Sequence, residues 1–507
     1  MKLICLLTFS LFFKVLFAQN IQNVVVWGAD PTGKIDAVPA IQKAINAADP
    51  KQKNIIYFPP GKYLIASFTQ TPNYLENYCL KMHHNLEFRG EGEKSIISLA
   101  KHIFEGNDSL KNAHLFYGRE IQNVAFKKLH IDLNGAENTP AEGVKKNHAA
   151  IFITHGRNVS LEKIKIINAA GTNMVNIKGR GSLLNIQECL FKNEAIIQKV
   201  NCNQYDFSFV YSEWDSTFIK KSKIVLQKDV AGICKKQRPY NGGIEIHGSD
   251  SWVKNCSISN CFPGMYIAST GKAMKNVIVS NNHFSGCTKG ISFWLEYPMD
   301  SITIRKNTIG IVSERLEHFR FCTGIEVPNG NASNYNSTLA NAASIKNLFV
   351  FDNIISASIS AENASGIMLH SIQHSKIERN EIKGVNRYGI ALLGSKWGSS
   401  FSSISQNEIH ILSENRRPTK QSTAYPIFVS DNFTQNGMRN CSFKKISVSN
   451  NAYVYKSEKS NTTNEESPCS IMIEIPEKCK QNINECIEIG QQRNNGTKDH
   501  ICRKYLP

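Results

Sequence analysis

Short runs of alternating apolar and polar residues recur along the middle of the chain, and they open at a glycine. In "GIEIHGS", Ile244 and Ile246 alternate with Glu245 and His247, which is the period-two pattern of a strand with one buried face. Such runs begin at Gly243, Gly264, Gly290, Gly324, Gly366 and Gly389, with spacings of 21, 26, 34, 42 and 23 residues. The runs are too short for helices, so their recurrence predicts a solenoid of short strands.

A second set of alternations lies between these runs and after the last one, and each contains an asparagine near its end. They read "VIVSNNHF", "ITIRKNTI", "LFVFDNII", "SKIERNEI" and "SSISQNEI". Each coil would therefore hold about two or three strands. Because asparagine returns at the turn of successive coils, we expect a ladder of stacked side-chain amides that satisfies buried turn groups.

The N-terminal region has a different pattern. Ile41, Ala44 and Ile45 recur at helical spacing between residues 37 and 48, and Asp36 is a suitable N-cap. "IIYF" and "KYLI" then predict two short strands about the turn "PPG". A small amphipathic helix at this place would cover the open end of a solenoid core.

These N-terminal stretches carry a family resemblance. "WGADPTGKIDAVPAIQKAINAA" followed by "IIYFPPGKYLI", and then "LEFRGEGEKSIISL", resemble the opening of the pectate lyase superfamily, in its rhamnogalacturonase and epimerase-like branch. The motifs cover roughly the first 140 residues. The resemblance implies an all-β fold, a right-handed parallel β-helix with a short N-terminal capping helix, that acts on polysaccharides. Ala37 departs from the pattern, because a second acidic residue is common there.

The domain organisation is predicted as follows. Residues 1–18 have the positive start, apolar run and small final residue of a signal peptide, although an uncleaved anchor is the alternative. Residues 19–452 would form the β-helix with its cap, and residues 453–507 a polar linker and a cysteine-containing tail. No later run is apolar and long enough to span a membrane, so we expect no integral membrane segment after cleavage and a secreted, periplasmic or cell-surface monomer.

Charge suggests the class of partner. The 59 Lys and Arg residues exceed the 42 Asp and Glu residues, which gives a formal net charge of +17. An exported protein rarely meets nucleic acid, so we expect an acidic polysaccharide as partner and no nucleic acid. A solvated basic surface without a specific partner is the alternative interpretation.

The cysteines leave two alternatives open. Without Cys5 of the signal peptide, 13 of the 14 cysteines remain, an odd number. Cys261 and Cys287 each lie three residues before a repeat glycine, so stacked coils would bring them within disulfide range, or they are buried free thiols. Cross-links are expected to hold the tail, where four cysteines gather. No pair has zinc spacing, and no aspartate cluster indicates calcium, so the cofactor is unknown: Ca²⁺ is compatible but has no predicted ligand set.

Candidate site residues follow from the strand register. With Ile244 and Ile246 inward, Glu245 and His247 point outward, and the same register on neighbouring coils gives a row of outward residues. The catalytic candidates are Glu245, His247, Lys178, Tyr266, Glu213 and Asp206. The substrate-binding candidates are Arg180, Asn176, Trp294, Glu326 and His370. The register of "YDFSFVYSEWDSTF", which contains Asp206, Tyr211 and Glu213, cannot be fixed from the sequence.

Two reactions fit such a row. In β-elimination from a uronic acid, Lys178 or Arg180 would neutralise the carboxylate, and His247 or Tyr266 would transfer protons. In hydrolysis, Glu245 would pair with Glu213 or Asp206 across the glycosidic bond; a pair on neighbouring coils would suit retention, and a pair two coils apart would suit inversion. The positive charge favours an acidic substrate and thus elimination, though modestly. The stretches at the glycines lack the aspartate pair of the polygalacturonase branch, so that branch's inverting machinery is not expected.

A third function stays open. A non-catalytic β-helix that binds glycans, or a surface adhesin, would carry aromatic and amide side chains without convergent acids and bases. The acidic and basic residues between Asp206 and His247 favour an enzyme. Outward polar residues are nevertheless common on any solvated sheet, and a Glu-Ile-His alternation arises readily by chance.

Overall fold

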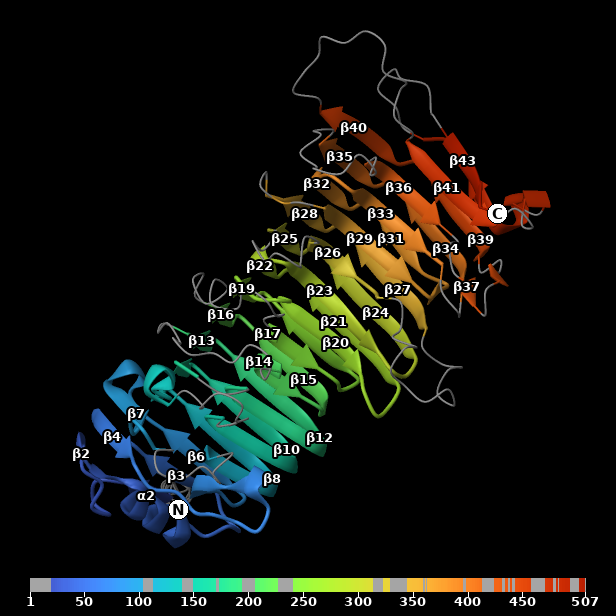
Figure 1. The fold of residues 1–507 in the computed structure, drawn as a ribbon. Helices are drawn as coiled ribbons and strands as arrows, with labels where there is room; N and C mark the ends of the chain where they lie inside the picture. The colour runs from blue at the N-terminus through green and yellow to red at the C-terminus, as the bar shows by residue number, and fades with distance from the viewer. Residues whose placement is uncertain are drawn as a thin grey trace, which may run out of the picture.

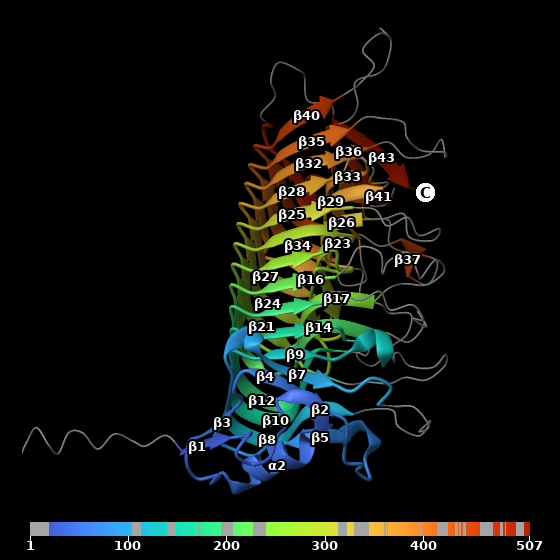
Figure 2. The ribbon, with the colours of Figure 1, turned by 90° about the vertical axis from the view of Figure 1, so that its left-hand side faces the viewer.

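The strands wind into a right-handed parallel β-helix, which confirms the expected fold class. The computed structural model describes residues 20–103, 113–138, 149–169, 173–193, 206–226, 240–312, 322–328, 344–358, 361, 363–394, 398–412, 424–430, 434–435, 438–439, 443–456, 470–476, 480–481, 483–492 and 501–506. Successive coils stack from the N-terminus at one end to the C-terminus at the other (Figure 1). Figure 2 shows the stack from the side, with one coil resting on the next.

Each coil of the described chain contributes to three faces, called here face 1, face 2 and face 3. Faces 1 and 2 belong to one 27-stranded sheet, because β8, β10 and β12 run across both, and face 3 is a separate 14-stranded sheet. Face 1 consists of β5 (Tyr78–Lys81), the first parts of β8 (His114–Lys127), β10 (Ile151–Glu162) and β12 (Val175–Gln187), then β14 (Asp206–Ser212), β17 (Tyr240–Ile246), β20 (Met265–Ser269), β23 (Lys289–Leu295), β26 (Cys322–Glu326), β29 (Ala364–His370), β33 (Tyr388–Leu393), β36 (Tyr425–Ser430), β41 (Ile471–Pro476) and β43 (Ile501–Leu506).

The other two faces follow the same order along the chain. Face 2 consists of β1 (Asn20–Asn23), β3 (Asn54–Tyr57), β6 (Leu86–Arg89), the second parts of β8, β10 and β12, then β15 (Asp215–Lys220), β18 (Ser251–Lys254), β21 (Met274–Ser280), β24 (Met299–Arg305), β27 (Ile345–Phe351), β30 (Ile372–Gln373), β31 (Lys376–Glu378), β34 (Ser399–Ser405), β39 (Phe443–Ser449) and β42 (Ile487–Ile489). Face 3 consists of β2 (Thr32–Asp36), β4 (Gly61–Ile65), β7 (Ser95–Leu99), β9 (His130–Asp132), β11 (Lys165–Ile167), β13 (Leu190–Lys192), β16 (Lys223–Val225), β19 (Ser257–Ser259), β22 (His283–Cys287), β25 (Thr308–Ile311), β28 (Ile354–Ala357), β32 (Glu381–Val385), β35 (Glu408–Leu412) and β40 (Ala452–Lys456).

The inward positions of the strands stack into continuous apolar columns. On face 1 one column contains Ile244, Met265, Ile291, Ile325, Ile367, Ile390, Ile427 and Ile471, all of them buried. Burying one such side chain contributes about 1.5–3 kcal/mol. Period-two alternation therefore fixes which side chains face outward, because a shift by one residue would expose the whole column.

The repeat glycines stack in a column of their own. A Cβ atom at Gly243 would lie less than 3.0 Å from the carbonyl oxygen of Gly264, and Gly264 has the same relation to Gly290. Isoleucine or phenylalanine side chains of face 3 would also contact a Cβ atom at these positions, as Ile258 would at Gly243. The glycines that open the alternations are thus required where coil backbones approach one another closely.

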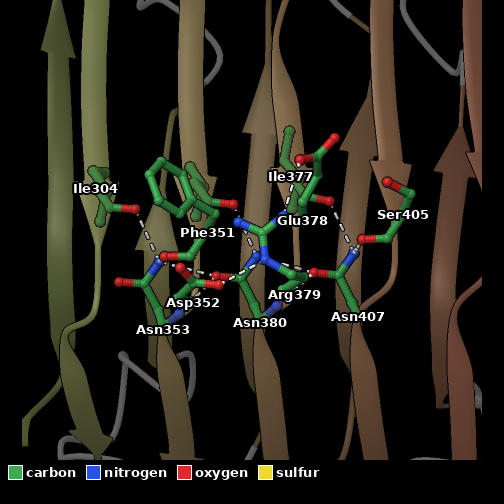
Figure 3. Close-up of polar contacts among 11 residues, drawn as sticks. Ile304, Phe351, Asp352, Asn353, Ile377, Glu378, Arg379, Asn380, Ser405 and Asn407 are labelled. Atoms are coloured by element: carbon green, nitrogen blue, oxygen red, sulfur yellow. Dashed lines mark hydrogen bonds and ion pairs between the residues drawn. The ribbon is translucent and has the colours of Figure 1, made fainter.

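An asparagine ladder runs along the corner between faces 2 and 3. The Nδ2 atoms of Asn353, Asn380 and Asn407 each lie 2.9 Å from the Oδ1 atom of the next amide, and Figure 3 shows the three in line. Each backbone N–H also donates to the next amide oxygen, at 3.0–3.1 Å. The full ladder consists of Asn282, Asn307, Asn353, Asn380, Asn407, Asn451 and Gln492. The amide ladder expected from the repeats is confirmed.

Replacing Asn380 by alanine is expected to lower the free energy of unfolding. The substitution leaves the Asn353 N–H and the Val350 carbonyl without their partners, and each such buried group costs about 1–3 kcal/mol. Urea titration followed by circular dichroism would measure the loss. The control is Asn46→Ala on the exposed side of the capping helix; equal loss in both variants would contradict a special role for the ladder.

The capping helix is α2 (Val38–Ala47), which lies at the N-terminal end of the stack (Figure 2). It buries Ile41, Ala44 and Ile45, as its spacing predicted. The N-cap prediction was wrong by one residue: Ala37 occupies that position, while Asp36 Oδ1 accepts hydrogen bonds from Val38 N (3.1 Å) and Ala66 N (2.9 Å). Other helical segments are α3 (Ile483–Cys486), η1 (Tyr74–Glu76), η2 (Gly92–Lys94) and η3 (Gly135–Glu137). A small antiparallel hairpin pairs β37 (Thr434–Gln435) with β38 (Met438–Arg439).

The cysteine alternatives are resolved at two places. Cys261 is a buried free thiol, so the disulfide with Cys287 is not formed. Burial raises the pKa of Cys261 well above its usual value, which keeps the thiol protonated at neutral pH. In the tail, Cys502 is disulfide-bonded.

Only part of the predicted domain organisation lies within the described residues. Residues 1–18 lie outside the described residues, so the signal peptide stays a prediction. The boundary at 452 falls at the start of β40, and β41, β42 and β43 of the expected tail pair with β36, β39 and β41. A separate tail unit thus stays a prediction, while its strands extend faces 1 and 2. None of the helices described is long and apolar enough to cross a membrane.

Candidate active site

The candidate residues gather on one row of outward side chains on face 1. The strand register brings Asn176, Tyr211, Glu245 and Tyr266 side by side on β12, β14, β17 and β20. The same row continues through Ser292, Glu326 and Met368. Residues 21 to 35 positions apart in the sequence thus become neighbours at a strand spacing of about 4.8 Å.

Glu245 and His247 form a hydrogen-bonded pair. His247 Nε2 lies 2.9 Å from Glu245 Oε1, and His247 Nδ1 contacts the hydroxyl of Thr270. Ser208 donates to Glu245 Oε2 at 2.8 Å. His247 points away from the core as predicted, but its side chain is only 4% exposed, against 14% for Glu245. With both ring nitrogens engaged, His247 orients Glu245, and the carboxylate is the group that can reach a substrate.

Glu213 forms the second oriented carboxylate. Its Oε1 accepts a hydrogen bond from the Tyr211 hydroxyl at 2.7 Å, and its Oε2 accepts one from Gly179 N at 2.6 Å. The Tyr211 ring also packs against His247, with ring centroids 4.7 Å apart. The two carboxylates therefore share Tyr211 as a common neighbour.

Lys178 supplies a cation beside these acids. Its Nζ lies 5.3 Å from the centre of the Tyr211 ring, a cation–π distance, and the side chain is partly exposed. Among the described residues no carboxylate lies within ion-pair distance of Lys178. The ammonium group is thus available to an anionic ligand.

A buried tryptophan supports this arrangement from beneath. Trp214 follows Glu213 directly, is fully buried, and its indole N–H donates to the carbonyl of Lys178 at 3.2 Å. The ring occupies a slot with Gly156 and Gly181 on its walls, where a Cβ atom would approach it to 3.0 Å or less. One side chain therefore anchors the backbone of both Lys178 and Glu213.

Other candidates lie farther along the row. Glu326 pairs with Lys289, and Ser292 Oγ lies 3.4 Å from Glu326 Oε2. Glu326 is three rungs from Glu245, which is roughly 14 Å. Trp294 is 38% exposed and donates to Glu296 at 3.0 Å, beside Ala268 rather than Glu245. These groups extend the face but do not contact the Glu245–His247 pair.

The remaining candidates do not join the carboxylate pair. Asp206 pairs in register with Tyr240, five residues before Glu245, and its side chain lies outside the described part. Arg180 is exposed on β12. Asn176 is fully buried, and both polar atoms of its amide lack hydrogen-bond partners among the residues that the structure describes. The prediction that Asn176 is surface-accessible was therefore wrong: it occupies the row but is covered.

His370 lies near the far end of the described row. Its Nδ1 lies 3.2 Å from the Gly394 carbonyl oxygen. Burial lowers the pKa of His370, a shift that this hydrogen bond and the charge of Glu326 oppose.

The lowered pKa of His370 predicts a pH dependence of stability. The unfolded chain binds the proton near the ordinary pKa of 6.5, while the folded chain binds it only at lower pH. The contribution of His370 is therefore present above pH 6.5 and is lost as the pH falls toward the lowered pKa. Urea titrations at pH 8 and pH 5.5 should show a smaller decrease in His370→Gln than in the wild type. A parallel decrease in both proteins would contradict this prediction.

Several contacts of the site were not predicted from the sequence. Ser208, Thr270 and Lys289 orient Glu245, His247 and Glu326 from neighbouring coils, and no motif marks them. Of these three residues, only Lys289 has a recognisable place in the sequence pattern, because it directly precedes the repeat glycine of its run. Within the described residues no three His, Cys, Asp or Glu side chains gather closely enough to hold a metal ion.

The geometry of the two carboxylates limits their chemistry. Tyr211 pairs in register with Glu245, and Glu213 lies two residues after Tyr211, just beyond the end of β14. One strand spacing combined with two residues of strand rise separates the two backbone positions by roughly 8 Å. Inversion and retention depend on the separation of the carboxyl groups themselves, about 6.5–9.5 Å for inversion and about 5 Å for retention.

Comparison with known proteins agrees with this fold. A family model described as "Rhamnogalacturonase A/epimerase, pectate lyase-like" matches residues 21–292. No curated protein matches the chain. Among solved structures, a variant of the tailspike protein of E. coli bacteriophage HK620 in complex with pentasaccharide is 14% identical, with a TM-score of 0.61, over 95% of this chain and 79% of that chain. The tailspike protein titled without a substitution, also in complex with pentasaccharide, gives 14% identity and a TM-score of 0.60 with the same coverage. At this identity the likeness concerns the fold.

Proposed function

Because the chain belongs to the rhamnogalacturonase A/epimerase, pectate lyase-like family, we propose that it is a carbohydrate-active enzyme that cleaves an acidic, uronate-containing polysaccharide on face 1. The observation that carries the proposal is the convergence of Glu213, Glu245 and Lys178 around Tyr211. Oriented acids beside an available cation are the groups that acidic-glycan cleavage needs.

Hydrolysis is the reaction that this arrangement supports best. One carboxyl group would protonate the oxygen of the leaving sugar, and the other would activate a water molecule on the opposite side of the ring. Glu213 and Glu245 come from neighbouring coils and share Tyr211 as a neighbour, which makes them the candidates for these two carboxyl groups. The role of His247, Ser208 and Tyr211 is then to fix the carboxylates in orientation, which lowers the cost of reaching the transition state.

β-Elimination is the second candidate, and Lys178 favours it. The ammonium group would neutralise the uronate carboxylate and make the adjacent proton more acidic. Tyr266, next to Glu245 in the row, is the side chain left for proton transfer, because His247 is buried with both nitrogens engaged. Arg180 is exposed and is a less suitable clamp than Lys178.

A non-catalytic glycan-binding protein or adhesin would not need two acids held by dedicated hydrogen bonds. The tailspike structures were solved with a bound pentasaccharide, which supports glycan binding on a fold of this kind. A polymeric glycan substrate is consistent with the secreted or cell-surface location expected from residues 1–18.

The proposal is tested by incubating the purified chain with a panel of acidic polysaccharides. New reducing ends without ultraviolet absorbance are expected for hydrolysis, and absorbance of unsaturated uronates for elimination. Neutral polysaccharides serve as controls and should be cleaved more slowly. Binding without either product on any acidic polymer would contradict the proposed enzyme and favour the glycan-binding alternative.

A further inference from the structure

A second set of aromatic side chains lies on face 2, outside the candidate active site. Phe218 on β15 pairs in register with Trp252 on β18. Their rings stack with centroids 5.0 Å apart at an interplanar angle of 22°, and both are only partly buried. β18 lies between β15 and β21, both of which are labelled in Figure 1. Two stacked outward rings form a flat surface of the kind that sugar rings contact.

Two lysines border this surface on the same strands. Lys220 pairs in register with Lys254, and Lys254 Nζ lies 4.9 Å from the centre of the Trp252 ring. Like charges directly opposite each other on neighbouring strands destabilise a sheet. In the described part of the chain neither lysine has a carboxylate within ion-pair distance. Phe218, Lys220, Trp252 and Lys254 are called the face 2 patch below.

Some other basic residues of face 2 are paired with acids. Lys127 contacts Glu87 at 3.5 Å and Glu162 at 3.7 Å, and Arg379 contacts Asp352 at 2.8 Å (Figure 3). Lys221 and Lys223, beside the patch, are both exposed. Glu188 lies near Lys221, and it contacts Lys163 at 3.6 Å. Positive charge therefore remains uncompensated at the patch, where the stacked rings are.

We propose that the face 2 patch binds a stretch of anionic polysaccharide separately from the candidate active site. Sugar rings would stack on Phe218 and Trp252, and carboxylate groups would pair with Lys220 and Lys254. The repulsion between the two lysines is relieved when the anion binds. The choice of a uronate polymer as the ligand rests on the proposed function. The excess of positive charge at the patch is an observation that does not depend on that function.

The experiment measures binding of the full chain to polygalacturonate by affinity electrophoresis, with dextran as neutral polymer. Lys220→Gln/Lys254→Gln and Trp252→Ala are each expected to weaken polygalacturonate binding about tenfold, the effect of 1.4 kcal/mol. The lysine variant should also bind with a weaker salt dependence. The matched control Lys275→Gln/Lys306→Gln removes the same charge from exposed positions outside the patch, at the start of β21 and just after β24, and should bind as the wild type does.

The outcomes separate the patch from the active site. Unchanged binding in both patch variants, or complete loss of binding in Glu245→Gln alone, would overturn the proposal. Tighter patch-dependent binding of a single-stranded oligodeoxynucleotide would also overturn it, and so would an oligomer that Trp252→Ala dissociates in sedimentation. If the wild type cleaves no polymer but patch-dependent binding persists, the proposed function is contradicted and the proposal that the patch binds anionic polysaccharide is supported.

Discussion

Glu245→Gln is expected to reduce polysaccharide cleavage by about 10²–10⁴-fold, the usual contribution of a positioned acid or base. Glutamine keeps the size and the acceptor for Ser208, but it cannot transfer a proton at neutral pH. The fold should be unaffected, because the side chain lies outside the apolar column. Initial rates of reducing-end or unsaturated-product formation, measured with circular dichroism of the variant, would test this.

The chain offers a matched control for this substitution. Glu408, Ile409 and His410 repeat the Glu-Ile-His sequence on β35 of face 3, and His410 Nε2 lies 2.6 Å from Glu408 Oε1. Glu408 is 56% exposed and is not on face 1. Glu408→Gln should therefore leave the cleavage rate unchanged. Equal losses in the two variants would mean that the assay reports stability or charge rather than the site.

Trp214→Ala is expected to lower the free energy of unfolding by about 3–5 kcal/mol, the usual cost of truncating a large buried aromatic. The indole fills the slot lined by Gly156 and Gly181, and the cavity left behind cannot close without moving two coils. Because the indole N–H anchors the Lys178 carbonyl, cleavage should also decrease in the variant at temperatures where it stays folded. Urea titration and rate measurements would check the two effects.

Gly181→Ala tests the same packing by changing a residue of the slot wall instead of the ring that fills the slot. A Cβ atom there would overlap the Trp214 ring, and overpacking costs about 1–3 kcal/mol or more. In the double variant with Trp214→Leu, the smaller side chain removes the overlap with the ring, while the close approach of the new methyl group to the Gly156 carbonyl oxygen, 2.6 Å, remains. The double variant should therefore be less destabilised than the sum of its two single changes. Simple additivity would contradict the packing explanation.

Periodicity carried most of the fold prediction. The alternation around Glu245 and His247 determines which isoleucines face inward, so the orientation of these side chains could be predicted. The repeated glycines mark where coils approach one another, and the repeated asparagines mark the turns, so the amide ladder could also be predicted from local patterns. The first strands and the capping helix followed from their motifs. The N-cap was misplaced by one residue because Asp36 binds both the helix start and Ala66, which directly follows β4, a contact between segments distant in sequence.

The candidate site was predicted less completely, because it depends on contacts between coils. Glu213 and Tyr211 could be paired with Glu245 only after the length of the preceding coil was known. His247 and Asn176 are buried although they occupy outward positions of the alternation, and strand alternation does not report such burial. Thr270, from the next coil, determines the ring orientation of His247, and no local motif identifies it.

The most direct test of the account is a crystal structure of the Glu245→Gln variant soaked with an acidic uronate oligosaccharide. The account predicts sugar density over β12, β14, β17 and β20, with a uronate carboxylate near Lys178 and a glycosidic bond between Glu213 and position 245. Ordered sugar only on another part of the molecule, with these residues uncovered in a variant that still binds, would contradict it.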